Sequence, residues 1–526
     1  MPIIRFAGAA TAIAALLSTN AVAAPGTPAL KKAAVAEVEA NAKLAQVIND
    51  SVFSFAELGF HEDETSKYLT TLLEKEGFTV ERNIAGLPTG WVAKWTKGSG
   101  GPVIALGSDI DGIPKASQKP GIPWREPLVA GGPGHGEGHN SGQAVNIVAA
   151  LAVKQLMERH NIPGTLMLWP GVAEELLATK AFYVREGVFK GVDASIFAHV
   201  ANAFTTSWGD SGSNGMVSVE YTFHGKTAHS AGQPWSGRSA LDGVELMDIA
   251  WNMRREHLPV TQRSHYVITN GGGQPNIVPG AASVWYYFRE RNFDSIRALY
   301  ETGNEISEAA AKATGTTVER RVLGYAAPMH GNRPLAEAAY RNIEKVGMPK
   351  WSADDQAFAK AVQTSNGFKL QPLADKVAPL GVPGGPAFGA SDDIGDVMWT
   401  VPTITVVYPS NIPNAIGHNV TSAMAMATPV AHKGVVAGAK AVALTVLDVA
   451  TTPKLVADAK DYFQNVQLKD QKYDPVLTKD DTPAIHLNGE VMERLRPKME
   501  PFYYNPAKYR TYLDQLGIKY PTVTAK

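Results

Sequence analysis

Four short apolar segments each end beside carboxylate or imidazole side chains, and this repetition limits the folds that are open to the chain. Apolar runs of this length suit strands that are buried on both faces of a parallel sheet. In an open α/β sheet, the ligand site lies outside the carboxyl ends of the strands. The sequence therefore predicts an α/β fold with a polar site at one edge of its sheet. The segments and their side chains are residues 103–106 with Asp109 and Asp111, 165–169 with Glu174 and Glu175, 194–197 with His199, and 403–408 with His418.

The loop of residues 134–140, Gly-His-Gly-Glu-Gly-His-Asn, adds a further polar segment. Glu137 and His139 stand two positions apart, so both can point at one metal ion if the loop is extended. The glycines let the backbone turn tightly around a small object. The loop thus predicts a metal site. The alternative is a flexible glycine loop with solvated histidines, since short His/Glu clusters also arise without function.

The number of candidate ligands suggests two metal ions. Two roughly tetrahedral ions that share a water need about five or six protein ligands. Glu174 and Glu175 make chemical sense if one binds metal while its free neighbour deprotonates the shared water. Taken alone, this pair is better explained as an acidic helix N-terminus, and His199 as a core histidine. Their common place at strand ends weakens both of these alternatives.

Length and charge narrow the class of protein. A chain of 526 residues, 44% of them hydrophobic, can bury a large core and is expected to hold two domains. The net charge of -1 argues against nucleic acid or an acidic membrane surface as the main partner. Cysteine is absent, so no disulfide framework is expected.

The N-terminus predicts export. Arg5 precedes an apolar run over residues 6–17, and Ala21-Val22-Ala23 fits the small-residue cleavage rule. The run is too short for a comfortable membrane span. We therefore expect residues 1–23 to be a cleaved signal peptide, with an uncleaved anchor as the alternative, and a periplasmic or secreted bacterial protein. No other segment is predicted to span a membrane.

The order strand–helix–strand–strand–helix over residues 215–321 is typical of a small α+β sandwich. We expect this unit to be inserted into a catalytic domain of residues 24–214 and 322–449. Residues 450–526 mix aromatic side chains with charges and prolines. They predict a C-terminal extension with short helices and without a chemical role.

Motifs from about residue 55 to residue 441 carry a resemblance to a known family. The chain resembles the di-metal amidohydrolases and metallopeptidases that include aminobenzoyl-glutamate hydrolase, hippurate hydrolase and the plant auxin-conjugate hydrolases. The resemblance implies a zinc-exopeptidase-like three-layer catalytic domain with an inserted ferredoxin-like lid and dimerisation domain. The motifs are residues 56–60, 109–111, 134–140, 173–175, 228–229 with 237–240, 275–279, 393–397 and, for the aminobenzoyl-glutamate branch in particular, 431–434.

The resemblance also implies roles for individual residues. Glu174 falls on the general base of the family, while Asp109, Asp111 and His135 are expected behind the ligands rather than among them. Two divalent ions are implied, Zn²⁺ as the first expectation and Mn²⁺ as the second. The residues on the metal-ligand positions are Glu137, His139, Glu175, His199 and His418.

Glu137 departs from the family pattern, because this branch usually has a cysteine at that position. A carboxylate is a harder ligand than a thiolate, so the change tilts the metal preference away from zinc. It also suits an oxidising compartment, where a thiolate ligand risks oxidation. The departure bears on metal identity and affinity more than on the existence of the site.

Three residues of the predicted insert have expected roles by resemblance. His229 would reach into the site of a neighbouring subunit and polarise the scissile carbonyl, which implies a homodimer or a higher homo-oligomer. Asn276 and Arg289 would hold a carboxylate of the substrate, for which a guanidinium fork is well matched. The plainer alternatives are a loop-capping histidine, an asparagine that forms a turn and an arginine on a strand surface.

The expected reaction is hydrolysis of the amide bond of an N-acyl amino acid, with an aminobenzoyl-glutamate-like substrate if the nearest branch governs. Trp91, Trp124 and Trp235 lie near the motif loops and could line a pocket for an aromatic acyl group, although a place in the core is the commoner one for tryptophan. One alternative is a dipeptidase or aminopeptidase of the same family. Another is an exported binding protein in which Glu137 has ended catalysis.

Overall fold

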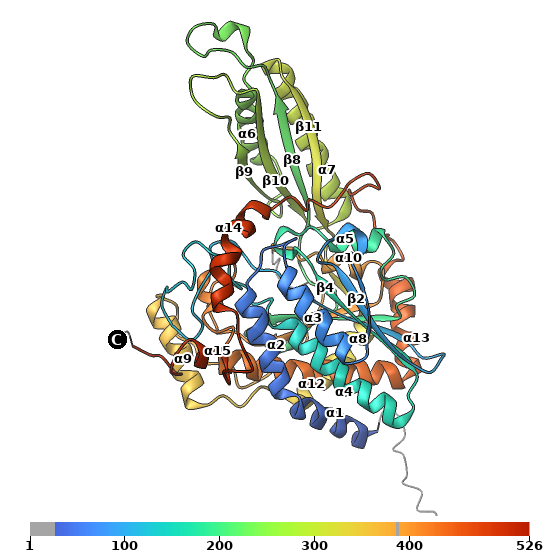
Figure 1. Ribbon diagram of the computed structural model, residues 1–526. Coiled ribbons are helices and arrows are strands. Elements are labelled where there is room, and N and C mark those ends of the chain that lie inside the picture. Colours follow the sequence, from blue (N-terminus) through green and yellow to red (C-terminus); the bar gives the residue numbers. More distant parts are fainter. Residues whose placement is uncertain (1–26, 385–388, 525–526) are drawn as a thin grey trace, which may run out of the picture.

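A computed structural model describes residues 27–384 and 389–524 of the chain (Figure 1). The predicted signal peptide lies outside these residues. A seven-stranded sheet forms the centre of the larger body. In spatial order its strands are β1 (Thr79–Arg82), β2 (Trp91–Lys97), β4 (Gly164–Gly171), β3 (Val103–Asp109), β5 (Ala194–Ala201), β13 (Thr403–Pro409) and β6 (Thr205–Thr206).

The middle of this sheet is parallel, as its apolar segments predict. β3 pairs in parallel with β4 and β5, and β5 pairs in parallel with β13. The outer strands β1, β2 and β6 are antiparallel to their neighbours. The carboxyl ends of β3, β4, β5 and β13 therefore meet at one edge, which is where the predicted site residues follow in the sequence.

Helices cover both faces of the sheet and make the predicted three layers. One face carries α4 (Gly142–His160) and α12 (Pro429–Thr451), with α1 (Pro28–Ala40), α2 (Ala42–Phe55) and α8 (Arg333–Val346) packed against them. On the other face, α5 (Lys180–Arg185) packs Tyr183 edge-to-face against Trp169 of β4, with ring centroids 6.2 Å apart. α10 (Ile394–Met398) lies beside α5. The α/β prediction is confirmed.

Among the described residues, α12 is the one helix that is long and apolar enough to cross a membrane. Its most apolar window has a mean hydropathy of 1.6, but 72% of that window is buried inside the protein. The helix packs against α4, α8 and β13. α12 is therefore a core helix of the larger body.

A second, elongated body projects from the first (Figure 1). Its first five elements follow the predicted order, while a further strand, β11, was not predicted and extends past residue 321. Both helices pack on the sheet and on each other. The four strands are antiparallel in the spatial order β11-β8-β10-β9. The elements are β8 (Gly215–His224), α6 (Ala240–Arg255), β9 (Arg263–Asn270), β10 (Ala281–Glu290), α7 (Phe293–Thr314) and β11 (Thr317–Ala326). We call this body the lid.

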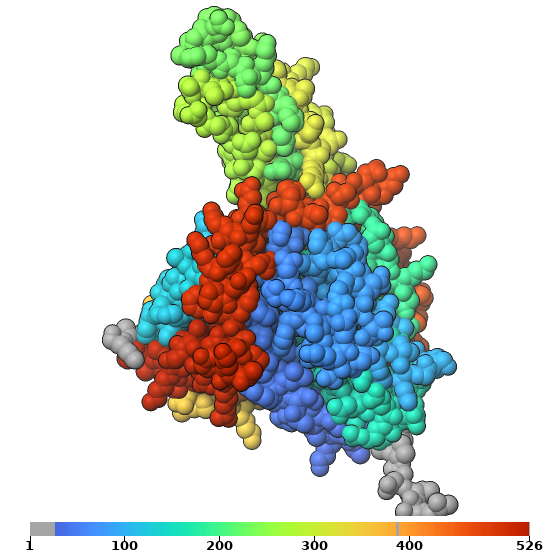
Figure 2. All heavy atoms as spheres, in the orientation of Figure 1, coloured from blue at the N-terminus to red at the C-terminus, as the bar shows by residue number. Residues whose placement is uncertain are grey.

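The C-terminal segment runs back over the larger body, where it lies beside the N-terminal helices in Figure 2. Its helices are α13 (Pro453–Tyr462), α14 (Gly489–Met499) and α15 (Tyr512–Gln515). Arg496 of α14 forms an ion pair with the buried Glu57, and the backbone N–H of Tyr512 donates to Asp50 of α2. These contacts hold the C-terminal segment against α2 and the residues that directly follow it. The remaining elements are α3 (Asp63–Lys75), α9 (Ala353–Ser365), α11 (Val420–Ala423), β7 (Gly209–Asp210) and β12 (His330–Gly331).

Candidate metal centre

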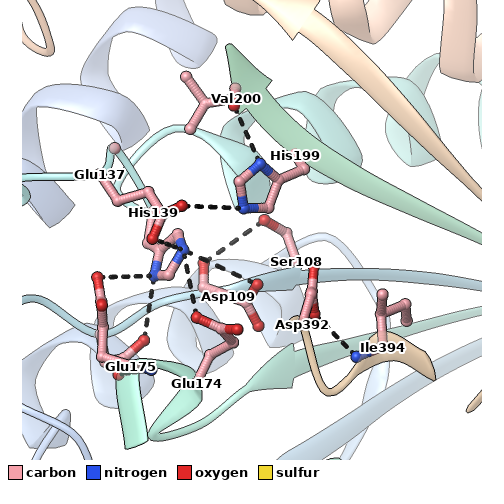
Figure 3. A network of polar contacts seen from close by, with 12 residues as sticks. Ser108, Asp109, Glu137, His139, Glu174, Glu175, His199, Val200, Asp392 and Ile394 are labelled. Carbon is pink, nitrogen blue, oxygen red and sulfur yellow. Dashed lines mark hydrogen bonds and ion pairs between the residues drawn. The ribbon is translucent and has the colours of Figure 1, made fainter. Parts of the chain in front are cut away.

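The strand ends bring the predicted metal-ligand side chains together (Figure 3). His139 and His199 face each other edge-on, with ring centroids 5.7 Å apart. Glu137 lies between the imidazoles, because its carboxylate oxygens are 3.6 Å from His139 Nε2, 3.8 Å from His199 Nε2 and 3.0 Å from His418 Nε2. The three histidines therefore surround one carboxylate.

Among the described residues, four groups of three ligand atoms lie within 4.8 Å of one another, and two of these groups together contain the five predicted ligands. Glu137, Glu175 and His418 make the first group. His139 and His199 make the second group with Asp109. Glu137 also lies within the same limit of His139 and Glu174. Because Glu137 reaches both groups, it is placed to be shared by two cations.

Backbone strain holds the acidic pair in place. Glu174 and Glu175 begin a single 3₁₀ turn, Glu174–Leu176, at the end of β4. Ala173 before it and Leu177 after it both adopt left-handed conformations, with φ of 49°. Such conformations are costly for residues with a side chain and are kept where the surrounding structure requires them. The turn directs both carboxylates to the sheet edge instead of continuing as a regular helix.

The protein alone crowds negative charge at this edge. Burial, together with the charges of Asp109 and Asp392, raises the pKa of Glu174 well above its usual range. Burial and the charge of Glu137 raise the pKa of Glu175 to about 8. The hydrogen bond that Glu137 accepts from His418 raises the pKa of His418 to about 9. Divalent cations would relieve this crowding, because they favour the ionised carboxylates.

Several buried atoms in the cluster lack hydrogen-bond partners among the described residues. They are Asp109 Oδ2, His139 Nε2 and Glu175 Oε2. Buried polar atoms without partners are rare in native proteins and call for an explanation such as a bound ion. Each of these atoms belongs to a residue type that ligates divalent metals through that atom. The residues present therefore fit a metal centre.

Asp111 holds two of the ligands from behind. One of its oxygens is 3.2 Å from His139 Nδ1, and the other accepts the backbone N–H of Glu175 at 3.0 Å. A carboxylate on the far nitrogen of a ligating histidine sets the tautomer and the orientation of the ring. His135 lies deeper, with Nε2 3.0 Å from the backbone oxygen of Val52. Burial lowers the pKa of His135 to about 4, so this imidazole is neutral.

Comparison with known proteins places the chain in a family. A family profile, M20_dimer, described as a peptidase dimerisation domain, matches residues 211–315. The chain is 33% identical over 476 residues to one of the subunits of p-aminobenzoyl-glutamate hydrolase from Escherichia coli (strain K12), an alignment that covers 85% of this chain and 97% of that protein. The chain belongs to the M20 peptidase family. It is therefore a hydrolase of the peptidase and amidohydrolase class.

Two further relatives agree with this membership. The Xaa-Arg dipeptidase of Mus musculus is 28% identical over 456 residues, which cover 84% of this chain and 95% of that protein. The crystal structure of an aminobenzoyl-glutamate utilization protein from Klebsiella pneumoniae has the same fold, with a TM-score of 0.52, 17% identity, and coverage of 79% of this chain and 96% of that one. The predicted family resemblance is confirmed.

The three predicted lid residues of this M20 hydrolase lie at opposite ends of the lid. The strand ends Gly215 and Glu290 pair at the base, and His224 and Ala281 pair at the tip. The tip lies roughly 30 Å from the base, because β8 has ten residues at about 3.3 Å each.

Arg289 lies at the base, where Nη1 donates to Ser391 Oγ of the catalytic domain at 3.0 Å. His229 and Asn276 follow the strands at the tip, on adjacent loops joined by the hydrogen bond from Ser230 N to Asn276 O. The structure therefore brings Arg289 to the metal centre and leaves His229 and Asn276 away from the centre of their own chain.

A cavity of about 680 Å³ opens in front of the metal centre. Ligand side chains stand at one end, and Arg289 and Ser391 also line it, together with apolar side chains such as Met329 and Val407. None of the three predicted tryptophans is among its lining residues. Trp91 is buried in β2, the indole of Trp124 donates to Glu126, and Trp235 is 74% exposed on the lid. The tryptophan prediction is therefore wrong for the pocket of a single chain.

Three residues that sequence reasoning missed complete the polar network behind the M20 site. Lys180 is fully buried, with Nζ 2.6 Å from Asp109 Oδ1 and in contact with Asp393. Asp392 lies 3.7 Å from the same ammonium and lines the cavity. Asp393 belongs to a family motif, which is a signal that could have found it. Lys180 belongs to none of the family motifs, so the sequence around it gave no signal of this kind.

Glu62, at the start of α3, provides a pH-dependent test of this buried network. Its carboxyl accepts hydrogen bonds from Thr89 Oγ1 at 2.6 Å and from Ala173 N at 2.8 Å. Burial and the charge of Asp111 raise the pKa of Glu62 to about 8. The folded state therefore favours the protonated carboxyl of Glu62. The contribution of this group to the stability of the fold is complete below the pKa that Glu62 has in the unfolded chain, and it is lost as pH rises through about 8.

We expect Glu62→Gln to be more stable than the wild type at pH 8, by on the order of 2–4 kcal/mol, and to differ little from it near pH 4. Urea unfolding of the chelated protein across this pH range measures the difference. Glu64→Gln, at a half-buried position two residues away, should follow the wild-type curve. Parallel curves for Glu62→Gln and the wild type would show that the pKa of Glu62 is the same in the folded and unfolded states.

Proposed function

We propose that this M20 hydrolase cleaves the amide bond of an N-acyl amino acid, with two divalent cations held at the strand ends. The supporting observation is that Glu137 belongs to one three-atom ligand group with Glu175 and His418 and to another with His139 and Glu174, in the lining of a cavity. The aminobenzoyl-glutamate relative suggests a leaving amino acid with a free carboxylate.

Glu137, Glu175 and His418 would hold one cation, and Glu137, His139 and His199 would hold the other. When bound, such cations supply Lewis acidity toward the amide carbonyl and lower the pKa of water toward neutrality. Zn²⁺ suits the imidazoles, while the carboxylate at position 137 makes Mn²⁺ a competitor. Metal analysis of the purified protein decides between the two ions.

Glu174 is the proposed general base. It lines the cavity, and its Oε2 is 3.8 Å from His139 Nε2, beside both ligand groups without being needed by either. From this position it can take a proton from the attacking water and return it to the nitrogen of the leaving amine. One carboxyl group thus serves both halves of the reaction.

Arg289 is the proposed carboxylate-binding residue. Its guanidinium lines the cavity, stacks over Tyr287 at 5.3 Å and leaves Nε without a partner among the described residues. A guanidinium presents parallel N–H donors that match the two oxygens of a carboxylate. The substrate carboxylate would therefore bind at the base of the lid, with the amide bond directed toward Glu174.

His229 is proposed to act on the site of a second subunit, as the peptidase dimerisation domain supports. The imidazole is exposed, and its Nδ1 accepts the backbone N–H groups of Ala231 at 3.2 Å and Gly232 at 3.1 Å. These two donors leave the ring proton on Nε2, which can then donate to a carbonyl oxygen. Asn276 on the adjacent loop would bind the same substrate.

Mixing two inactive variants tests this arrangement. His229→Ala and Glu174→Gln should each lose activity as pure homodimers. In mixed dimers, the subunit with intact Glu174 receives His229 from its partner, so one of the two sites is restored. After exchange of equal amounts, about a quarter of wild-type activity is expected for dimers that form at random. Activity that stays at the level of the separate variants would show that His229 does not act across subunits.

Screening the metal-loaded protein against N-acyl amino acids tests the proposed reaction. The panel should include p-aminobenzoyl-glutamate, aliphatic and aromatic N-acyl amino acids, and unblocked dipeptides. Release of the free amino acid from N-acyl substrates is expected. Preference for dipeptides would favour the dipeptidase alternative. A protein that binds these compounds, carries no transition metal and cleaves none of them with Zn²⁺ or Mn²⁺ would be a binding protein.

We also propose that the protein is exported, on the basis of the N-terminal pattern and the absence of cysteine. The carboxylate at position 137 supports this proposal, because it cannot be oxidised as a thiolate ligand can. N-terminal sequencing of the protein from the periplasmic fraction should find a chain that starts after Ala23 or Ala24. A full-length chain in the cytoplasm would contradict export.

A further inference from the structure

We propose that Asp109 is a direct ligand of the cation held by His139 and His199, and that Lys180 is the positioning residue that turns it toward that cation. This inference rests on the proposed two-cation site and changes the role predicted for Asp109 from the sequence. It also assigns a role to Lys180, which the sequence did not single out.

Asp109 ends β3 and is completely buried, with its two carboxylate oxygens in different surroundings. Oδ1 lies 2.6 Å from Lys180 Nζ. Oδ2 has no hydrogen-bond partner among the described residues and lies 4.0 Å from His139 Nε2. Asp109 also belongs to the compact three-atom group with the two histidines. The unpaired oxygen is therefore directed at the position where two imidazole nitrogens converge (Figure 3).

Lys180 is held so that it can fix this orientation. Its side chain is fully buried, and its ammonium contacts Asp393 on the side away from Asp109. The other oxygen of Asp393 accepts the backbone N–H groups of Thr179 and Lys180, at 3.2 and 3.1 Å. The lysine therefore has little freedom to move. One oxygen of Asp109 is occupied by a rigid counter-charge, and rotation of the carboxylate would break that ion pair.

Close packing behind the carboxylate restricts Asp109 further. Gly171 of β4 stands opposite Asp109 in the parallel register, and a Cβ placed there would lie 1.8 Å from Asp109 Oδ1 and 2.9 Å from Lys180 Nζ. The backbone of β4 passes directly over the ion pair between Asp109 and Lys180. A side chain at position 171 would therefore displace this ion pair.

A purely structural ion pair would explain Oδ1 but leave Oδ2 buried and unpaired, which is costly. Ligation explains both oxygens. A monodentate carboxylate with its second oxygen held by a neighbouring donor is the arrangement expected around a metal ion. With Glu137, the second cation would then have four protein ligands, and the shared water would make it five-coordinate, an expansion that catalytic Zn²⁺ sites allow.

Metal content tests the proposal without reference to activity. Asp109→Asn keeps the shape of the side chain but weakens its power as a ligand. Asp392→Asn removes the same charge from the same cluster; its carboxylate groups with Asp109 and Glu174 but with neither histidine, and it is the matched control. Each protein is loaded with Zn²⁺, dialysed against a weak chelator and measured for metal per chain. The visible spectrum of the Co²⁺-loaded form reports the geometry of each ion.

We expect two metal equivalents for the wild type and for Asp392→Asn. For Asp109→Asn, we expect one equivalent, or a second ion bound 10- to 100-fold more weakly, with a changed Co²⁺ spectrum. Lys180→Gln should leave both oxygens of Asp109 in place but weaken the binding of the same ion. Equal losses from Asp109→Asn and Asp392→Asn would show an effect of charge and would overturn the proposal. If Asp109→Asn bound two metal equivalents with an unchanged Co²⁺ spectrum, the proposed ligation by Asp109 would also be overturned. The proposed two-cation site would remain valid in that case.

A wild type that binds fewer than two equivalents would overturn the proposed two-cation site and this inference together. Anomalous diffraction from zinc-loaded wild-type crystals gives a result that does not depend on the folding of any variant. Asp109 Oδ2 at about 2.0–2.2 Å from an ion is expected. A separation beyond about 3 Å would exclude ligation.

Discussion

Replacing Glu174 with glutamine should lower kcat/KM for N-acyl amino acids by about 10²–10⁴-fold, with both metal ions retained. The amide keeps the size of the side chain but cannot take a proton from water or return it to the leaving amine. Glu174 belongs to neither of the two proposed ligand sets, so metal content should stay at the wild-type value. Initial rates and metal analysis on the same preparation measure both quantities.

The matched control is Glu186→Gln, an exposed glutamate just after α5 that pairs with Arg185 at 2.9 Å. It should leave the rate and the metal content unchanged. The conservative variant Glu174→Asp should regain part of the lost rate, because it restores a carboxylate at a shorter reach. If Glu174→Gln kept the wild-type kcat, another residue would be the general base.

The second large effect is expected at Glu137, the one carboxylate within 4.0 Å of all three histidines of the centre. Glu137→Gln should lose at least one metal ion per chain and lower activity by roughly 10³-fold, because both proposed cations share this ligand. The loss should be only partly restored by excess metal. If the variant kept wild-type activity after extensive dialysis, Glu137 would not be a ligand shared by both cations.

Glu137→Cys tests the chemistry of the family departure. A thiolate at this position should keep two ions but favour softer metals, so the ratio of activity with Zn²⁺ to activity with Mn²⁺ should rise by about tenfold. The variant should also become sensitive to oxidants, since a thiolate ligand can be oxidised. Metal competition in a reducing buffer, compared with the wild type, measures the shift. An unchanged ratio would show that the ligand at position 137 does not control metal choice.

The sequence was sufficient for the fold class and for the list of metal-ligand candidates. Apolar strand segments and the polar residues that follow them are local patterns. A parallel sheet places all such strand ends at one edge, so Glu137, His139 and His199 could be expected together before any contact was known. The strand–helix order of the lid was equally local, and the family motifs added the role of Glu174.

The tertiary structure decided which candidates face one another and what each of their atoms contacts. It placed Arg289 at the cavity and His229 at the far tip of the same lid, although both belong to one small domain. It also separated the two oxygens of Asp109, one held by Lys180 and one left facing two imidazoles. Such relations depend on burial and on contacts between residues far apart in the chain, here 71 positions between Asp109 and Lys180. No periodicity or local spacing encodes contacts of that kind, so only the folded chain reveals them.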